Sequence, residues 1–233
     1  MGRIKYTRPE REAMIAVFLK AAREIIGAEG IARVSIRAVA KKTGYSSASL
    51  YLYFKDLDEL ISMAVMEYYE AFCRELTGLS AGDARQAYTE AWRTICKYAF
   101  DFPEIFQHIF FAPRARPMKE TAEAYYEIFP QKIEDGGEAL RRLLLAGTLE
   151  ERNLAILGTL IDDGSLSATE AELVSNMTVG YFRTLLDERR RPVGDSHNAE
   201  LTERQLTAVD FLLRSAIKNK RLDMVPAGLY NPD

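Results

Sequence analysis

The sequence predicts an all-α protein, because helical spacing of apolar residues recurs along nearly the whole chain and no useful β-type alternation interrupts it. The chain has 233 residues, 48% of them hydrophobic and 28% charged, which is enough to bury a sizeable core. No apolar run approaches the ~18 residues of a membrane span, and we therefore expect no membrane attachment. No internal repeat is present at a period of about 20 to 50 residues.

The first 55 residues predict three helices in quick succession. Apolar residues at helical spacing favour a first helix over about residues 9–29, with Gly30 as its C-terminal stop. Ser35 suits the N-cap of a short second helix, and Gly44 suits the turn after it. A third helix is expected over about residues 47–54.

The rest of the chain, residues 56–233, predicts a larger helical domain. One long helix is expected to start at Leu57 and to carry apolar positions as far as Phe72, with a loop over residues 78–83. Further helices are expected over residues 138–146, 151–162, 168–189 and 202–217.

Aromatic residues gather in the middle of the chain. Residues 88–129 contain 11 of the 24 aromatic residues, and the helix-breaking Pro103, Pro113 and Pro117 fall among them. This combination favours short helices around an apolar cavity, although most of these side chains could equally fill the core. The candidate ligand-binding residues are Tyr88, Trp92, Phe102, Phe106, His108, Phe110, Tyr125, Tyr126 and Phe129.

Charge is distributed unevenly. Residues 1–55 hold 11 Lys and Arg against 4 Asp and Glu, whereas the remainder holds 20 against 30. A basic end on an acidic body is typical of attachment to a polyanion through that end, although a solvated basic arm has the same signature. The two cysteines and two histidines cannot build a metal cage or a disulfide framework. We expect no cofactor, no metal and a cytoplasmic protein.

The segment 35–54 has the form of a helix-turn-helix. Leu50 and Phe54 lie at i and i+4, so one face of the second helix can pack and the other can enter a groove. The serines on the free face allow close approach to DNA, and their hydroxyl groups can bind phosphate oxygens. An ordinary helical hairpin is the alternative.

Residues 10–60 resemble the DNA-binding domain of the tetracycline-repressor (TetR) family of transcriptional regulators. The matching residues are Gly30, Ser35, Ile36, Val39, Ala40, Gly44-Tyr45-Ser46, Leu50-Tyr51-Leu52-Tyr53-Phe54-Lys55 and Asp58-Glu59-Leu60-Ile61. Two departures are Ala48, where glycine is frequent, and Leu57, where many relatives have lysine. The resemblance implies an N-terminal three-helix domain with a helix-turn-helix, over residues 1–55, followed by a helical ligand-binding and dimerisation domain, over residues 56–233.

The resemblance also implies roles for single residues. Ser35 would cap the helix that faces the DNA backbone, and Arg37 would lie close to phosphates. The start of the recognition helix would present its serines, and the tyrosines beyond them would contact phosphate. The implied DNA-binding residues are Ser35, Arg37, Ser46, Ser47, Ser49, Tyr51, Tyr53 and Lys55.

The last two predicted helices each carry an apolar stripe. Such stripes usually form a protein core, but the family resemblance implies a dimer interface here, which would let two recognition helices read two half-sites. The candidate interface residues are Leu173, Met177, Gly180, Tyr181, Leu206, Val209, Leu213 and Ile217.

These observations predict a homodimeric DNA-binding regulator, and the family favours a repressor. Its partners would be double-stranded DNA with a two-fold site and a small apolar or aromatic effector. The alternatives are a helical ligand-binding protein or a small enzyme that acts on an aromatic substrate. No nucleophile elbow, phosphate loop or Cys/His pair at recognisable spacing supports an enzyme.

Overall fold

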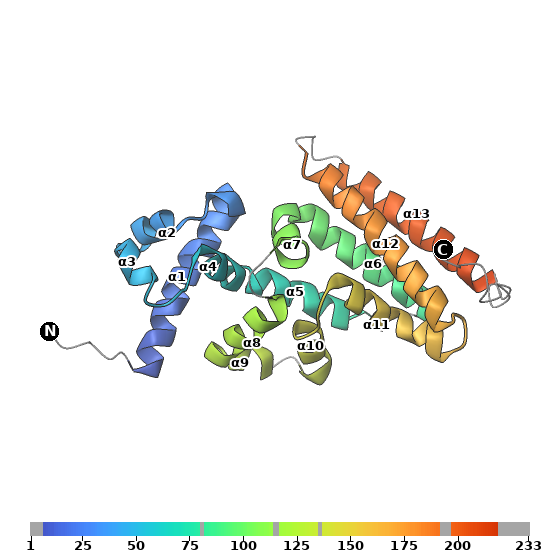
Figure 1. Ribbon diagram of the computed structural model, residues 1–233, viewed down its shortest axis with the longest axis horizontal. Helices are drawn as coiled ribbons and strands as arrows, with labels where there is room; N and C mark the ends of the chain where they lie inside the picture. Colours follow the sequence, from blue (N-terminus) through green and yellow to red (C-terminus); the bar gives the residue numbers. More distant parts are fainter. Residues whose placement is uncertain (1–6, 80–81, 114–116, 135–136, 192–196, 219–233) are drawn as a thin grey trace, which may run out of the picture. The chain divides into compact units, whose positions relative to one another are not determined.

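A computed structural model describes residues 7–79, 82–113, 117–134, 137–191 and 197–218 (Figure 1). Within these ranges the chain forms α-helices and one short 3₁₀ turn, and no strand occurs, so the all-α prediction is confirmed. The chain divides into two compact units. Unit 1 comprises residues 1–79 and 97–149, and unit 2 comprises residues 80–96 and 150–233.

Unit 1 begins with α1 (Arg8–Glu29), which a capping box starts. The Glu10 carboxylate accepts hydrogen bonds from the backbone and hydroxyl of Thr7, and the Thr7 hydroxyl caps the Glu10 amide in return. A 3₁₀ turn, η1 (Ile31–Arg33), leads to α2 (Ile36–Thr43).

The second predicted helix is capped as expected. The Ser35 hydroxyl accepts a hydrogen bond from the Ala38 amide at 3.1 Å. Gly44 ends α2 at a φ of 77°, a left-handed conformation that favours glycine.

The next two predicted helices are shorter than expected. The helix α3 (Ser47–Leu50) ends four residues before the predicted limit, because the chain continues in a tight turn in which Tyr53 N donates to Leu50 O at 2.9 Å. The single long helix predicted after residue 56 is divided at Val65 into α4 (Leu57–Ala64) and α5 (Met66–Thr77).

The remaining helices of unit 1 come from residues 97–149, a range that includes Pro103, Pro113 and Pro117. They are the C-terminal end of α6 (Ala84–Asp101), α7 (Pro103–Phe110), α8 (Met118–Ile128), α9 (Gln131–Glu134) and α10 (Gly137–Leu144). Within the unit, α1 packs on α2 and α4, α4 packs on α8, and α5 packs on α10. The helix α4 therefore joins the N-terminal helices to those that follow, and the predicted domain boundary between residues 55 and 56 falls inside a single compact unit.

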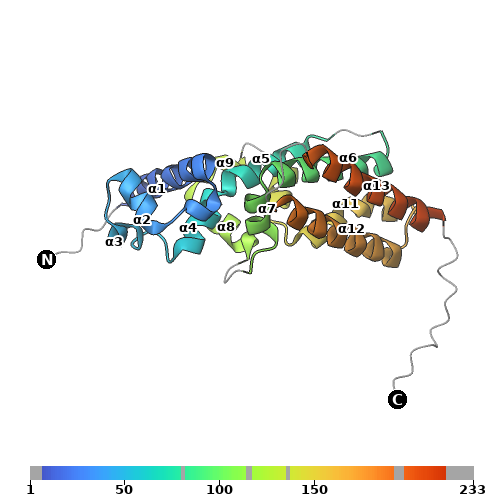
Figure 2. The same ribbon diagram turned by 90° about the horizontal axis from the view of Figure 1, so that it is seen from above.

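Unit 2 contains the first part of α6 with α11 (Leu149–Asp162), α12 (Ala168–Arg189) and α13 (His197–Lys218). The helices α12 and α13 form its most extensive pair and run side by side in both views (Figures 1 and 2). The last helix starts at His197 and not near residue 202 as predicted. No helix in the described ranges has both the length and the apolar character that crossing a membrane requires.

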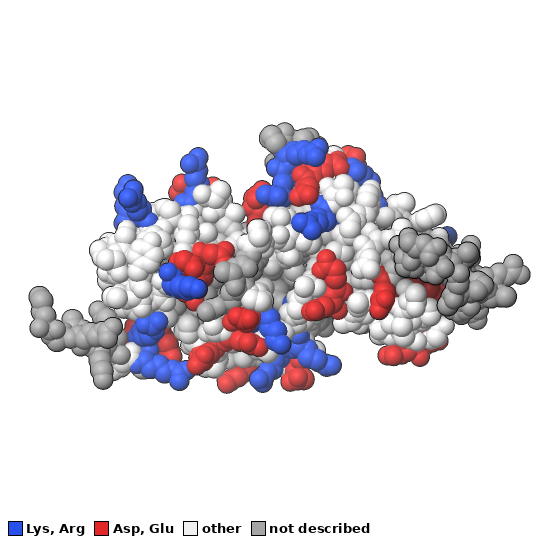
Figure 3. Space-filling model, in the orientation of Figure 1, with Lys and Arg blue, Asp and Glu red and all other residues white. Residues whose placement is uncertain are grey.

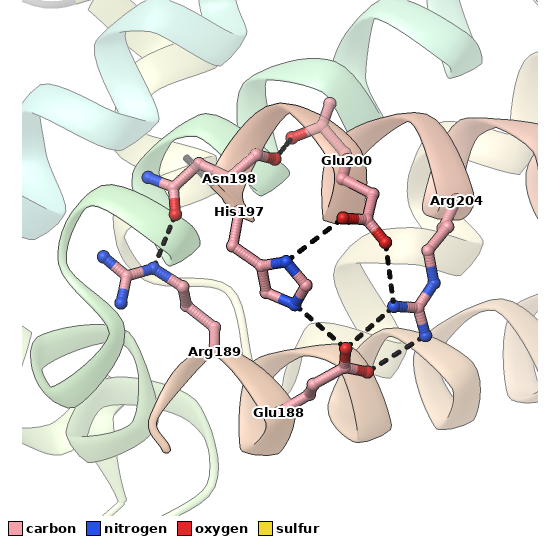
Figure 4. A network of polar contacts seen from close by, with 7 residues as sticks. Glu188, Arg189, His197, Asn198, Glu200 and Arg204 are labelled. Atoms are coloured by element: carbon pink, nitrogen blue, oxygen red, sulfur yellow. Dashed lines mark hydrogen bonds and ion pairs between the residues drawn. The ribbon is translucent and has the colours of Figure 1, made fainter. Parts of the chain in front are cut away.

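A polar network joins the end of α12 to the start of α13 (Figure 4). Glu188 accepts two hydrogen bonds from the Arg204 guanidinium, at 2.8 and 3.0 Å, and its Oε1 lies 3.0 Å from His197 Nε2. The other His197 nitrogen lies 3.2 Å from Glu200. Arg204, with a smaller contribution from His197, holds the pKa of Glu188 at about 2, well below its ordinary value of 4.5.

This network predicts an acid-sensitive contribution to stability. Because the pKa of Glu188 is depressed in the folded state, its contribution is complete above about pH 4.5 and disappears as the pH falls through about 2. We expect Glu188→Gln to lower the melting temperature at pH 7 and to lose this effect on titration toward pH 2, as measured by circular dichroism. Asp187→Asn is the control, because Asp187 is exposed and its ion pair with Arg190, at 3.6 Å, is longer than the contacts of Glu188. A difference that does not vary with pH would contradict the assignment.

Candidate functional site

The helix-turn-helix segment is built around one buried ring. Phe18 of α1 is fully buried and makes edge or tilted ring contacts with Tyr45, Tyr53 and Phe54, at centroid distances of 5.4, 5.5 and 6.2 Å. Leu50 is also fully buried. These contacts fix one side of α3 and the turn after it, so the opposite side is left to face solvent.

The outward side of this segment carries large side chains. Tyr51 is 58% exposed and Leu52 is 64% exposed. The predicted DNA-binding residues Arg37 and Lys55 are exposed as well. Tyr53 is only partly exposed, because its ring packs on Phe18.

The serines of the segment have mainly local partners. Ser46 caps α3 by accepting from the Ser49 amide at 3.2 Å, and the Ser46 and Ser49 hydroxyls lie 2.9 Å apart. Ser35 caps α2 as described above. Ser47 is the first residue of α3 and is partly exposed. Local hydrogen bonds of the Ser35, Ser46 and Ser49 hydroxyls therefore stabilise the helix starts and the turn.

Sequence reasoning missed Arg11. Its guanidinium donates to the Leu52 carbonyl at 3.1 Å and lies over the Tyr53 ring at 5.4 Å. The last carbonyl groups of a helical turn lack intrahelical partners, so a donor from α1 completes the end of this segment. The sequence signal was an arginine in the first turns of α1, but nothing local shows which carbonyl it meets.

Some cations near the segment are already paired. Lys42 lies 2.9 Å from Glu24 of α1, whose pKa this contact lowers. Figure 3 shows acidic and basic side chains intermixed over the face that it draws. The positive charge available to a polyanion is therefore smaller than the N-terminal count of Lys and Arg suggests.

The predicted ligand-binding residues of unit 1 belong mainly to a tightly packed aromatic cluster. The Phe106 and Phe110 rings lie tilted to each other with centroids 4.6 Å apart, and both contact Phe72 of α5 at about 6 Å. The cavity that remains among these rings measures about 10 Å³, about the space of a single water molecule. Phe102, at the edge of the cluster, is 42% exposed.

A second aromatic group lies on α8. Tyr125 and Tyr126 are buried, and Tyr125 contacts both Tyr126 and Phe129, at 5.3 and 4.9 Å. The Tyr126 hydroxyl is buried with no hydrogen-bond partner in the described ranges. Burial raises the pKa of Tyr126 well above its ordinary value.

The two remaining aromatic candidates fall in unit 2 and belong to a polar part of its core. Trp92 Nε1 donates to Asn153 at 3.0 Å, and Asn153 donates in turn to Ser175 of α12 at 3.0 Å. Tyr88 contacts Trp92 at 6.5 Å and is fully buried. The nine candidates are thus divided between the two units.

His108 joins two helices of unit 1. Its Nε2 lies 3.0 Å from the hydroxyl of Ser62, which is buried in α4. His108 is itself half-buried on α7. The contact ties the aromatic region to the helix that leads directly from the helix-turn-helix.

The apolar stripes of α12 and α13 divide into an inner and an outer set. Leu206, Val209 and Leu213 are buried within the protomer, in which α13 packs on α12. Leu173 and Met177 are 54% and 50% exposed. The remaining candidates are Gly180, which is exposed, and Tyr181 and Ile217, which are partly exposed.

Sequence reasoning also missed Phe211, a residue of α13 that is 68% exposed. It lies off the stripe that was used for the prediction. Across the ranges that can be described, no group of three or more His, Cys, Asp or Glu residues could hold a metal ion.

Residues 18–63, from the buried Phe18 to the end of α4, match the family described as bacterial regulatory proteins, tetR family. The chain carries a TetR-family DNA-binding domain. The resemblance that the sequence indicated is confirmed over this segment, and the match supports a TetR-like transcriptional regulator. No curated protein matches the sequence significantly.

Over most of its length the chain resembles solved structures of regulators with a TetR-like fold. A transcriptional regulator from Cytophaga hutchinsonii is 15% identical, with a TM-score of 0.56 over 87% of this chain and 98% of that one. A TetR-family regulator from Mesorhizobium loti is 14% identical, with a TM-score of 0.52 over 91% and 98%. RolR in complex with resorcinol is 15% identical, with a TM-score of 0.52 over 90% and 96%. At these identities the likeness concerns the fold.

The cap on α2 provides a test of how the TetR-like domain is held. Ser35→Ala removes the acceptor for the Ala38 amide, and we expect it to lower the free energy of unfolding by about 1 kcal/mol. Urea denaturation followed by circular dichroism measures this. Ser47→Ala is the matched control, since Ser46 and not Ser47 caps α3. Equal stability of the two variants would show that the cap contributes nothing.

Proposed function

We propose that this protein is a homodimeric repressor that binds operator DNA through residues 35–55 and is released by a small apolar or aromatic effector. The match of residues 18–63 to the tetR family is the observation that carries this proposal. DNA is the partner that this domain implies, and the protein would act in the cytoplasm as a regulator without catalytic activity.

The DNA-facing surface would consist of the outward side of α3 and its turn. Tyr51, Arg37 and Lys55 are exposed and can reach phosphate oxygens, while the exposed Leu52 can contact a thymine methyl group. Arg11 would position this surface by holding the Leu52 carbonyl. The serines would set the backbone close to the groove, and Tyr53 would support the segment from behind.

The dimer interface would be the outer face of α12 and α13. Leu173, Met177 and Phe211 expose apolar surface that a partner would cover, and Gly180 allows close approach. The buried Leu206, Val209 and Leu213 would support this face from within. A two-fold pair would present two recognition segments to a two-fold operator.

An effector must favour the state that does not bind DNA, since a ligand with equal affinity for both states shifts nothing. RolR, which shares the fold, is known in complex with resorcinol, an aromatic compound. The aromatic cluster of unit 1 has almost no free space, so an effector would either open it or bind beside it. His108, through Ser62 of α4, lies on the route from this region to the DNA-binding helices.

Fluorescence anisotropy tests the DNA-binding proposal. The titrant is the DNA upstream of the coding region, with an unrelated duplex as control, at two salt concentrations. We expect binding that favours the upstream DNA and weakens steeply with salt, with a log–log slope of about −0.9 for each phosphate contact. Absence of binding to either duplex at low salt would contradict the proposal.

Tyr51 tests the placement of the recognition segment. We expect Tyr51→Ala to weaken binding to all DNA sequences roughly tenfold, because a phosphate contact is lost, with little change in melting temperature. Tyr51→Phe keeps the ring and should show most of the same loss if the hydroxyl makes the contact. Wild-type affinity in Tyr51→Ala would mean that another segment faces the DNA.

Phe211 tests the dimer face. A buried unpaired carboxylate is costly, so we expect Phe211→Glu to be monomeric at micromolar concentration in sedimentation velocity. Ala199→Glu, an exposed position in the first turn of α13, introduces the same charge away from the apolar face and should stay dimeric. A dimeric Phe211→Glu protein would place the interface elsewhere.

A further inference from the structure

An open groove of about 720 Å³ lies in unit 1 along the second half of α1. Its other sides come from α5, the end of α6 and Phe102. This volume is within the range of about 300 to 1,000 Å³ that is typical of ligand sites. The neighbouring aromatic cluster, in contrast, encloses about 10 Å³. The groove can therefore accept a small molecule without any rearrangement of the core.

One wall of the groove is aromatic. Tyr68, Tyr98 and Phe102 line it, and the Tyr68 and Phe102 rings meet edge to face at 5.4 Å. Phe102 is 42% exposed although it belongs to a densely packed aromatic region. Exposed aromatic surface in a concave site is suited to a flat ring, which would cover it.

The other lining residues are mostly charged, and their carboxylates are already paired with cations. Glu67 lies 3.0 Å from Arg23 and 2.7 Å from Lys132, so two cations share one carboxylate. Glu24 lies 2.9 Å from Lys42. Both carboxylates of the lining therefore already have cationic partners.

Lys20 is the cation of the groove lining that is best placed to meet an anionic ligand. It lines the groove, is exposed, and has no carboxylate within 4.0 Å in the part of the chain that the structure describes, although its charge makes a small contribution to the lowered pKa of Glu24. The lining itself holds two cations, Lys20 and Arg23, and two carboxylates. Lys42 and Lys132, which do not line the groove, pair with those carboxylates as well, so both carboxylates have cationic partners other than Lys20. An anionic group next to the aromatic wall would therefore be attracted to Lys20.

We infer that this groove binds a small planar aromatic carboxylate, whose ring lies on Tyr68 and Phe102 and whose carboxylate meets Lys20. This inference rests on the proposed function in one respect, since it makes the groove the effector site. The ligand would touch α1, and the same helix holds the recognition segment through Phe18 and Arg11. Binding at Lys20 would thus act directly on the helix that positions the DNA-binding residues.

Isothermal titration calorimetry of the full-length protein tests the site. The probes are benzoate, phenylacetate and 2-naphthoate, with 2-naphthamide as the uncharged counterpart and cyclohexanecarboxylate as the non-aromatic one. We expect at least one aromatic carboxylate to bind once per protomer, and both counterparts to bind at least tenfold more weakly. No binding of any aromatic carboxylate at millimolar concentration would overturn the inference.

Two variants locate the binding. Lys20→Gln removes the cation from an exposed position. It should lower the affinity for the aromatic carboxylate at least tenfold and leave the affinity for 2-naphthamide unchanged. Lys119→Gln is the matched control, because Lys119 is an exposed lysine of α8 that does not line the groove. Phe102→Ala should lower the affinities for the aromatic carboxylate and for 2-naphthamide to the same extent, because both ligands would lose the same ring contact. Equal affinities in Lys20→Gln and Lys119→Gln would overturn the inference.

A second measurement separates this inference from the proposed function. The aromatic carboxylate that binds is added to the complex of the protein with its upstream DNA, and the anisotropy is followed. We expect DNA affinity to fall in the wild type and in Lys119→Gln but not in Lys20→Gln. DNA binding without any carboxylate binding would overturn the groove alone, and carboxylate binding without DNA binding would overturn the regulator alone. Carboxylate binding that leaves DNA affinity unchanged would overturn the groove as effector site.

Discussion

The conformation of the helix-turn-helix segment depends on the burial of Phe18 in α1. A helix of four residues such as α3 is far below the length at which an isolated helix is stable, so its conformation must come from tertiary contacts. Phe18 supplies them through Tyr45, Tyr53 and Phe54, and Arg11 closes the far end at the Leu52 carbonyl. The outward direction of Tyr51 follows from these inward contacts. A change in the position of α1 would therefore alter the exposed surface of this segment.

The same helix is also part of the body of unit 1. Arg8 of α1 donates to the Glu127 carbonyl at the end of α8, and Arg23 pairs with Glu67 of α5, which also binds Lys132 of α9. These contacts lie at the start of α1 and in its second half, and α4 packs against both α1 and α8. The helix-turn-helix is thus not an independent attachment. Its longest helix, α1, also contacts the part of unit 1 that carries Tyr125, Tyr126 and Phe129.

Local chemistry made part of this structure predictable from the sequence. Ser35 and Gly44 bound α2 as expected, because capping depends on a few adjacent residues. The break at Val65, the short α3 and the role of Arg11 were not predictable, because distant contacts decide them. The same holds for Trp92, whose partner Asn153 is 61 residues away. Periodicity gave the stripe of Val209 and Leu213 on α13 but could not distinguish a protomer core from a dimer interface, and it overlooked Phe211.

The packing of the aromatic residues also decides where an effector can act at low cost. Opening the cluster around Phe72 and Phe106 would expose rings whose burial contributes roughly 1.5 to 3 kcal/mol each. That cost would lower the apparent affinity of any ligand that needs the open state. The groove beside α1 carries no such cost, since its aromatic wall is already exposed at Phe102. A ligand that binds there more tightly in one position of α1 would shift α1 toward that position. The helix α1 lines the groove and also contacts the helix-turn-helix segment.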